Sequence, residues 1–80
     1  MKKKIDFKFI KNVFSNALNI GDYDLKLESK FEEVPEWDSL GHMRIIQELE
    51  EQLNIEFDID EIIDVDTVEK IMDLAKSKFK

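Results

Sequence analysis

The chain contains no cysteine, and this absence excludes several kinds of chemistry. Disulfide bonds, thiolate-bound metal centres and a cysteine nucleophile are all ruled out. Any reaction of this protein that needs a thiol must therefore use a group that is added to the chain.

Long apolar runs are also missing. Asp6, Lys8 and Lys11 interrupt the apolar residues near the start before the core of a secretion signal can form. No stretch is long enough to cross a membrane as a helix. We therefore expect a cytoplasmic protein. Its 80 residues predict a single domain, residues 1–80, of a size at which stability is marginal and a deep cleft cannot form.

Basic residues are scarce in the middle of the chain. Residues 36–69 hold twelve acidic side chains against the single Arg44. By contrast, residues 1–35 hold seven lysines against six acids, and residues 70–80 hold four lysines against one aspartate. An acidic surface repels nucleic acid and anionic lipid and attracts basic patches on other proteins. The alternative is that this acidic surface binds no partner and only makes the protein soluble.

Apolar spacing predicts a first helix that begins after the capping residue Asp6. It should end near Gly21, which can take a left-handed conformation. The connection over residues 22–38 is long, and its apolar residues predict that it packs onto the helices. These residues are Leu25, Leu27, Phe31 and Val34.

Three further helices are predicted, each after an acidic capping residue. Asp38 precedes a long apolar helical pattern, and Asp58 or Asp60 can begin a short third helix. Asp66, with a glutamate three residues later, imitates a capping box at the start of the last helix. No repeat, low-complexity run or β-type alternation is present. The predicted fold is all-α: an antiparallel four-helix bundle with a long first loop and a short third helix.

Ser39 directly follows the cap Asp38 and is expected in the first turn of the second helix. Unpaired N–H groups and the positive end of the helix dipole make such a place favourable for a phosphate. A phosphate ester on the Ser39 oxygen would therefore be well accommodated. The alternative is that Ser39 is only a second capping residue, because Asp-Ser before an apolar run is common at helix starts.

The segment from Trp37 to Leu53, the acids after it and the later Asp66-Thr67-Val68 resemble an acyl or peptidyl carrier protein over nearly the whole chain. In that family the serine of an Asp-Ser-Leu motif carries a 4′-phosphopantetheine arm, and Asp38-Ser39-Leu40 matches the motif. The resemblance implies a carrier and not an enzyme. A separate magnesium-dependent phosphopantetheinyl transferase would add the arm from coenzyme A, and acyl or aminoacyl groups would ride as thioesters on its thiol.

Three residues beside the motif, Trp37, Gly41 and His42, differ from those of the usual fatty-acid carriers. They make the chain look more like stand-alone carriers of specialised pathways, such as the modification of small acids, amino acids or surface glycans. We therefore expect a cargo other than a long-chain fatty acyl group. Because glycine is costly in a helix, we interpret Gly41 as allowing close approach by an enzyme or by the arm.

Two other kinds of site fail on context or spacing. Ser39 and His42 with a carboxylate could suggest a hydrolase triad, but nothing supplies an oxyanion hole or an enclosed pocket. His42 is instead expected at the surface, where it could touch the prosthetic arm. A calcium loop that begins at Asp58 needs glycine at its sixth position, which is Ile63, so no metal site is predicted.

The partner-binding surface is predicted on the acidic second and third helices. Leu40 lies off the core stripe of the helical wheel, so we expect it to be exposed beside Ser39 as an apolar anchor, although lone exposed leucines are ordinary. The acidic residues of this surface are Glu48, Glu51, Glu56, Asp60 and Glu61. Expected partners are the transferase and loading or transferring enzymes with basic docking patches.

We expect a monomer with no nucleic-acid partner and no membrane insertion. A function from a different class stays open, namely a small acidic helical adaptor that binds basic proteins without a prosthetic group.

Overall fold

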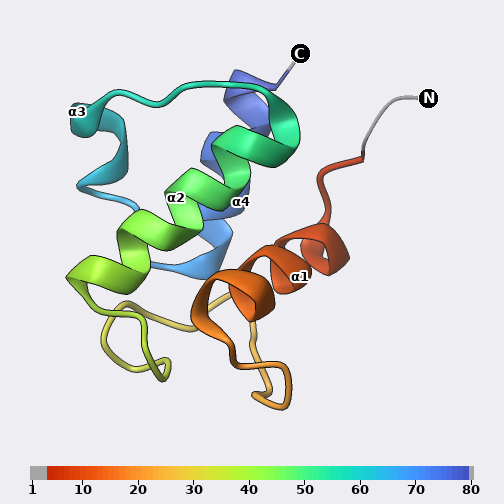
Figure 1. Ribbon diagram of the computed structural model, residues 1–80, viewed down its shortest axis with the longest axis vertical. Helices are drawn as coiled ribbons and strands as arrows, with labels where there is room; N and C mark the ends of the chain where they lie inside the picture. The colour runs from red at the N-terminus through yellow and green to blue at the C-terminus, as the bar shows by residue number, and fades with distance from the viewer. Residues whose placement is uncertain (1–3, 80) are drawn as a thin grey trace.

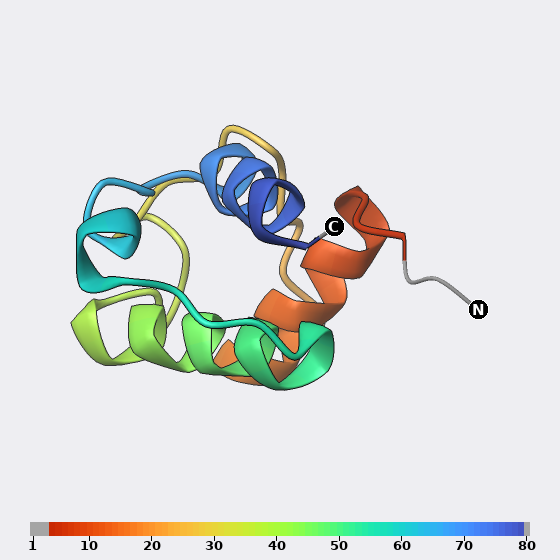
Figure 2. The same cartoon turned by 90° about the horizontal axis from the view of Figure 1, so that it is seen from above.

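The computed structural model describes residues 4–79, and within this range the secondary structure is helical with no strand. The helices are α1 (Phe7–Leu18), α2 (Ser39–Leu53), α3 (Ile59–Ile62) and α4 (Val68–Lys78). Figures 1 and 2 show α1 running in the opposite direction to α2, with α4 on a third side of the bundle. The predicted all-α bundle with a long first loop and a short third helix is confirmed. None of these helices is long and apolar enough to cross a membrane.

The core is built from the helices and from the first loop together. Trp37, the last loop residue before the cap of α2, is only 1 % exposed. Its ring meets that of Phe14 in α1 edge-on, with the centroids 4.8 Å apart, a favourable aromatic geometry. Leu25 and Val34 of the loop are also buried, which confirms that this connection packs onto the bundle. α2 contributes four buried residues with branched apolar side chains: Ile45, Ile46, Leu49 and Leu53.

Two predicted helix ends are wrong in detail. α1 ends at Leu18, and its C-cap residue Asn19 takes the left-handed conformation with φ 57°, whereas Gly21 has no positive φ. Asparagine tolerates this conformation better than most residues because its short polar side chain can bond locally. α4 is capped by Thr67, whose Oγ1 accepts the Lys70 N–H at 3.1 Å. The Asp66 carboxylate is instead bound by Lys70 Nζ at 3.0 Å, so it does not act as the cap.

Backbone hydrogen bonds tie the first loop to the start of α4. The Val68 N–H donates to the Ser29 carbonyl at 3.1 Å, and the Phe31 N–H donates to the Asp66 carbonyl at 2.9 Å. The first N–H groups of a helix lack partners within the helix, so the loop supplies acceptors that α4 needs. The loop is thereby held in place on its way to α2.

Gly41 lies where the first turn of α2 packs against the chain's own backbone. A Cβ atom at this position would overlap the carbonyl oxygen of Glu36 and would lie 2.8 Å from Leu18 Cδ2. Gly41 is buried, so an approaching enzyme or arm is not what requires a glycine here. The interpretation of Gly41 as a place of close approach is therefore wrong, and internal packing is the reason for the glycine.

Gly41→Ala should lower the free energy of unfolding by about 1–3 kcal/mol, because the added methyl group meets backbone that cannot move aside. Urea denaturation followed by circular dichroism measures this loss. Gly21→Ala is the matched control, since a Cβ there meets only Ser15 Oγ at 3.4 Å. Equal stability of the two variants would contradict the proposed close contact.

Candidate functional site

Ser39 is the first residue of α2, and its side chain is exposed. The preceding Asp38 supplies the cap: its Oδ1 accepts the Gly41 N–H at 2.9 Å, and its carbonyl accepts the His42 N–H at 2.7 Å. Among the contacts within residues 4–79, none involves the Ser39 hydroxyl. The cap is therefore complete without Ser39, whose oxygen is free to react.

Unpaired backbone N–H groups at the start of α2 make the surroundings of Ser39 favourable for an anion. The N–H groups of Ser39 and Leu40 come before that of Gly41, which is the first one that Asp38 binds. They therefore have no acceptor within the helix. They lie at the positive end of a fifteen-residue helix. An anionic group on the Ser39 oxygen would meet donors and a favourable field.

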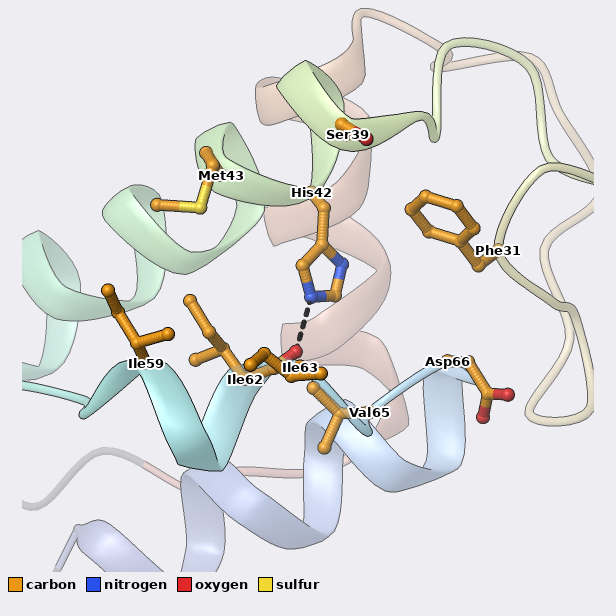
Figure 3. A pocket seen from close by; sticks show the side chains of 9 residues that line it. All are labelled: Phe31, Ser39, His42, Met43, Ile59, Ile62, Ile63, Val65 and Asp66. Carbon is orange, nitrogen blue, oxygen red and sulfur yellow. Dashed lines mark hydrogen bonds between the residues drawn. The ribbon is translucent and has the colours of Figure 1, made fainter.

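A groove of about 440 Å³ opens beside Ser39 between α2 and α3, as Figure 3 shows. Ile59 of α3 and its C-cap residue Ile63 are 70 % and 67 % exposed at this groove. They are four residues apart and therefore share one side of the short helix. Most of the lining is apolar: Phe31, Met43, Ile59, Ile62, Ile63 and Val65, with Ser39, His42 and Asp66 as the polar members.

His42 forms part of the groove wall and is half-buried, so it is less exposed than the surface histidine that was expected. The Trp37 indole N–H donates to His42 Nδ1 at 3.0 Å, and His42 Nε2 lies 2.8 Å from the Ile62 carbonyl oxygen, the contact dashed in Figure 3. An indole nitrogen can only donate, so Nδ1 is the acceptor and Nε2 carries the proton. Both ring nitrogens are thus occupied, which leaves none to act as a base for Ser39.

A comparison with known protein families matches the chain over residues 8–75 to the family described as the phosphopantetheine attachment site. The chain belongs to this family. The match includes the Asp38-Ser39-Leu40 motif, and it confirms the resemblance to carrier proteins that the motif indicated. Proteins of this family carry covalently attached 4′-phosphopantetheine, and they are carriers and not catalysts. No solved structure matches the chain significantly.

The acidic residues predicted to bind partners of this carrier domain lie on one side of α2 and in or near α3. Glu48 and Glu51 lie beside Arg44 on the side that faces α1, and Glu48 is half-buried. Its carboxylate accepts a hydrogen bond from Gln52 at 2.6 Å. Leu40 is 63 % exposed, as its place on the helical wheel predicted. Glu56 and Asp60 are exposed in and near α3.

Glu61 is already engaged within the carrier domain. Its Oε1 accepts the Asp58 N–H at 2.8 Å and Lys78 Nζ of α4 at 2.9 Å. The Asp58 N–H and then Lys78 lower the pKa of the Glu61 carboxyl below its ordinary value. Glu61 therefore holds α3 against α4, and of the predicted acidic set it is the one most committed to the fold.

The sequence analysis did not predict the apolar groove. Its signal is the group Ile59, Ile62 and Ile63, because a helix of one turn cannot direct all three side chains into the core. Ile62 is buried, and the other two are exposed. Met43 belongs to the apolar pattern of α2, but it also lies exposed at the groove.

Asp38→Ala should lower the free energy of unfolding by about 1 kcal/mol, because the Gly41 N–H loses its side-chain acceptor. Chemical denaturation measures the change. Asp38→Asn keeps an oxygen acceptor and should retain most of the stability. Asp6→Ala is the matched control, since Asp6 caps α1 with the same 2.9 Å bond to the Phe9 N–H. Wild-type stability in Asp38→Ala would contradict the importance of this cap.

Proposed function

We propose that this protein is an acyl or aminoacyl carrier protein that bears 4′-phosphopantetheine on Ser39. The observation that carries the proposal is the exposed Ser39 hydroxyl at the start of α2, in a chain whose family is defined by this attachment. Asp38 and Leu40 are proposed to take part in binding the arm beside Ser39, and residues 1–80 are proposed to form one carrier domain. Because the chain has no cysteine, the thiol that binds the cargo as a thioester must belong to the arm.

The residues around Ser39 fit such a group. A phosphate ester carries negative charge, and the free N–H groups of Ser39 and Leu40 lie at the positive end of α2. The carboxylate of the adjacent Asp38 is turned toward the Gly41 N–H by its capping bond. The apolar groove beside Ser39 offers a surface for uncharged parts of an attached group.

In this proposal Ser39 is a substrate of the transferase. Its oxygen forms a new bond to the phosphorus of coenzyme A that bears the pantetheine, and the diphosphate bond at that phosphorus breaks. Adenosine 3′,5′-bisphosphate leaves, and a base of the transferase takes the hydroxyl proton. Within residues 4–79 no side-chain base contacts the Ser39 hydroxyl, so activation must come from the partner enzyme.

Ser39→Ala should abolish modification. The apo protein is incubated with coenzyme A, magnesium and a broad-specificity phosphopantetheinyl transferase, and intact mass is then measured. The wild type should gain the mass of one phosphopantetheine group, and Ser39→Ala should gain nothing. Ser77→Ala is the control because Ser77 is also an exposed serine in a helix. A wild type that stays unmodified would falsify the carrier proposal.

Partner enzymes are proposed to dock through basic patches on the acidic helices, with Leu40 as the apolar anchor. Carrier domains interact with the transferase and with biosynthetic enzymes in general. Leu40 is exposed next to Ser39, as a docking contact at the attachment site requires. The acidic residues proposed for this role are Glu48, Glu51, Glu56, Asp60 and Glu61.

Glu48→Lys with Glu51→Lys should lower the transferase kcat/KM several-fold and weaken its dependence on salt, because two attractions become repulsions. The assay compares wild type and variant from low to high salt, after circular dichroism shows that both are folded. Asp22→Lys with Glu28→Lys is the matched control, since it changes the net charge equally at exposed positions of the first loop. An equal loss in both double variants would point to net charge alone.

The nature of the cargo stays a prediction. Trp37, Gly41 and His42, which suggested a specialised pathway, all have roles inside the fold: core packing, close backbone contact and a link to α3. Because the fold itself accounts for these three residues, they are not evidence for a cargo other than a long-chain fatty acyl group. The cytoplasmic location and the monomeric state also stay predictions.

A further inference from the structure

α3 is held in place by a few contacts from outside itself. Its four residues are too few for a stable isolated helix, because a single turn does not offset the cost of nucleation. Ile62 is its buried anchor, and the Lys78–Glu61 ion pair ties it to α4. The His42 bond to the Ile62 carbonyl is the side-chain hydrogen bond that ties α3 to α2.

The bond from His42 also satisfies a group that the helix itself leaves without a partner. The last four carbonyls of a helix have no N–H of the same helix to accept from. Ile62 is the last residue of α3, and the imidazole of a residue twenty positions earlier donates to its carbonyl. His42 thus acts as a C-terminal cap that comes from another helix.

A second bond fixes the chemical state of His42. Nδ1 accepts the Trp37 indole N–H, and the two ring planes lie within 11° of parallel, so the donor points into the plane of the imidazole. Phe31 packs edge-on against the same ring with the centroids 5.7 Å apart. The arrangement requires the neutral tautomer with the proton on Nε2.

We propose that neutral His42 is a positioning residue that clasps α3 to the start of α2, and that a proton added to Nδ1 opens the groove beside Ser39. The proton comes from solvent and occupies the Nδ1 lone pair, so the Trp37 N–H loses its acceptor and the ring must move away. Release of the ring weakens its hold on the Ile62 carbonyl. The consequence for an arm on Ser39 rests on the proposed function, but the clasp itself does not.

Two carboxyl groups near this clasp, those of Asp66 and Glu61, have lowered pKa values. Asp66 is the other ionisable member of the groove lining, and Figure 3 shows its carboxylate directed away from His42. Its bond to Lys70 lowers the pKa of the Asp66 carboxyl, as the Asp58 N–H and Lys78 do for Glu61. Other charged residues near these elements are Lys30 and Glu32 in the loop, Asp38 before α2, and Asp58, Asp60 and Asp64 around α3.

The direction of the pH effect follows from these shifts. A carboxylate with a lowered pKa stabilises the fold above its ordinary titration range and loses this contribution only at lower pH. The Glu61–Lys78 pair therefore persists between about pH 8 and pH 5, the range in which histidine changes charge. Glu61 also raises the pKa of Lys78, so this amine stays charged as well. Weakening of α3 in this range would thus not come from loss of the Glu61–Lys78 pair.

The test is hydrogen exchange of the apo protein by NMR, with rates corrected for the intrinsic effect of pH on exchange. His42 and Trp37 are the single histidine and the single tryptophan, so the imidazole and indole signals are unambiguous. As the pH falls from about 8 to about 5, the Ile63 amide and the Trp37 indole N–H should exchange about tenfold faster. At the higher pH, ¹⁵N shifts of the ring should show the proton on Nε2.

Two substitutions separate the clasp from general packing. His42→Gln keeps a donor and an acceptor but does not titrate, so α3 should stay protected with no step in pH. His42→Phe keeps an aromatic ring without either bond, so Ile63 should exchange about tenfold faster at every pH. Glu61→Gln is the matched control: it loosens α3 from α4 and should keep the pH step.

Three results would overturn the clasp: wild-type exchange in His42→Phe, a pH step that persists in His42→Gln, or a proton on Nδ1 in the neutral ring. Because every measurement uses the apo protein, failure of Ser39 modification would remove the proposed function and leave these results unchanged. Conversely, a modified Ser39 together with any of the three would remove the clasp alone.

Discussion

Burial of Trp37 immediately before the cap of α2 determines how that helix leaves the loop, and the arrangement around Ser39 follows from it. The indole is held by Phe14 of α1, so the chain enters α2 from inside the bundle. Asp38 then ends the loop by capping the helix, and Ser39 is turned outward. One turn later, His42 returns to the indole and donates onward to α3. A single buried ring thus positions both the exposed hydroxyl and the wall of the groove.

The same geometry separates two kinds of surface on α2. The side toward α3 is apolar and forms the groove with Met43 and the isoleucines of α3. The side toward α1 carries Glu48 and Glu51 around Arg44. Ser39 lines the apolar groove and does not line the charged side. The apolar groove and the charged side of α2 are therefore two separate surfaces.

Local features of the sequence predicted most of the fold, because caps and apolar periods depend on residues only a few positions apart. Asp6 and Asp38 cap the helices as expected, and Leu40 is exposed as its wheel position required. The prediction was wrong at the start of α4, where two adjacent polar residues could each act as the cap. Thr67 and not Asp66 caps α4, because the Asp66 carboxylate is bound by a lysine.

The features that escaped prediction depend on residues that meet only after folding. Gly41 is needed because the Glu36 carbonyl and Leu18 lie against it, and neither approach follows from a helical pattern. His42 binds a carbonyl twenty positions away, so its sequence neighbours carry no sign of that contact. The groove likewise needs α2 and α3 placed side by side. The motif around Ser39 could be recognised because its residues are consecutive in the sequence. The groove beside it depends on tertiary contacts, so its shape could not be predicted.

Differences in local stability connect these contacts to the behaviour of a carrier. A net hydrogen bond contributes only about 0.5–1.5 kcal/mol, while a small domain is stable by roughly 5–15 kcal/mol. Loss of one clasp therefore cannot unfold a bundle whose core extends through α1, α2 and α4, but it can release a helix of a single turn. The element beside Ser39 is thus the one whose position can change at small cost. Movement near Ser39 is compatible with a rigid core because α3 contributes Ile62 as its one fully packed side chain.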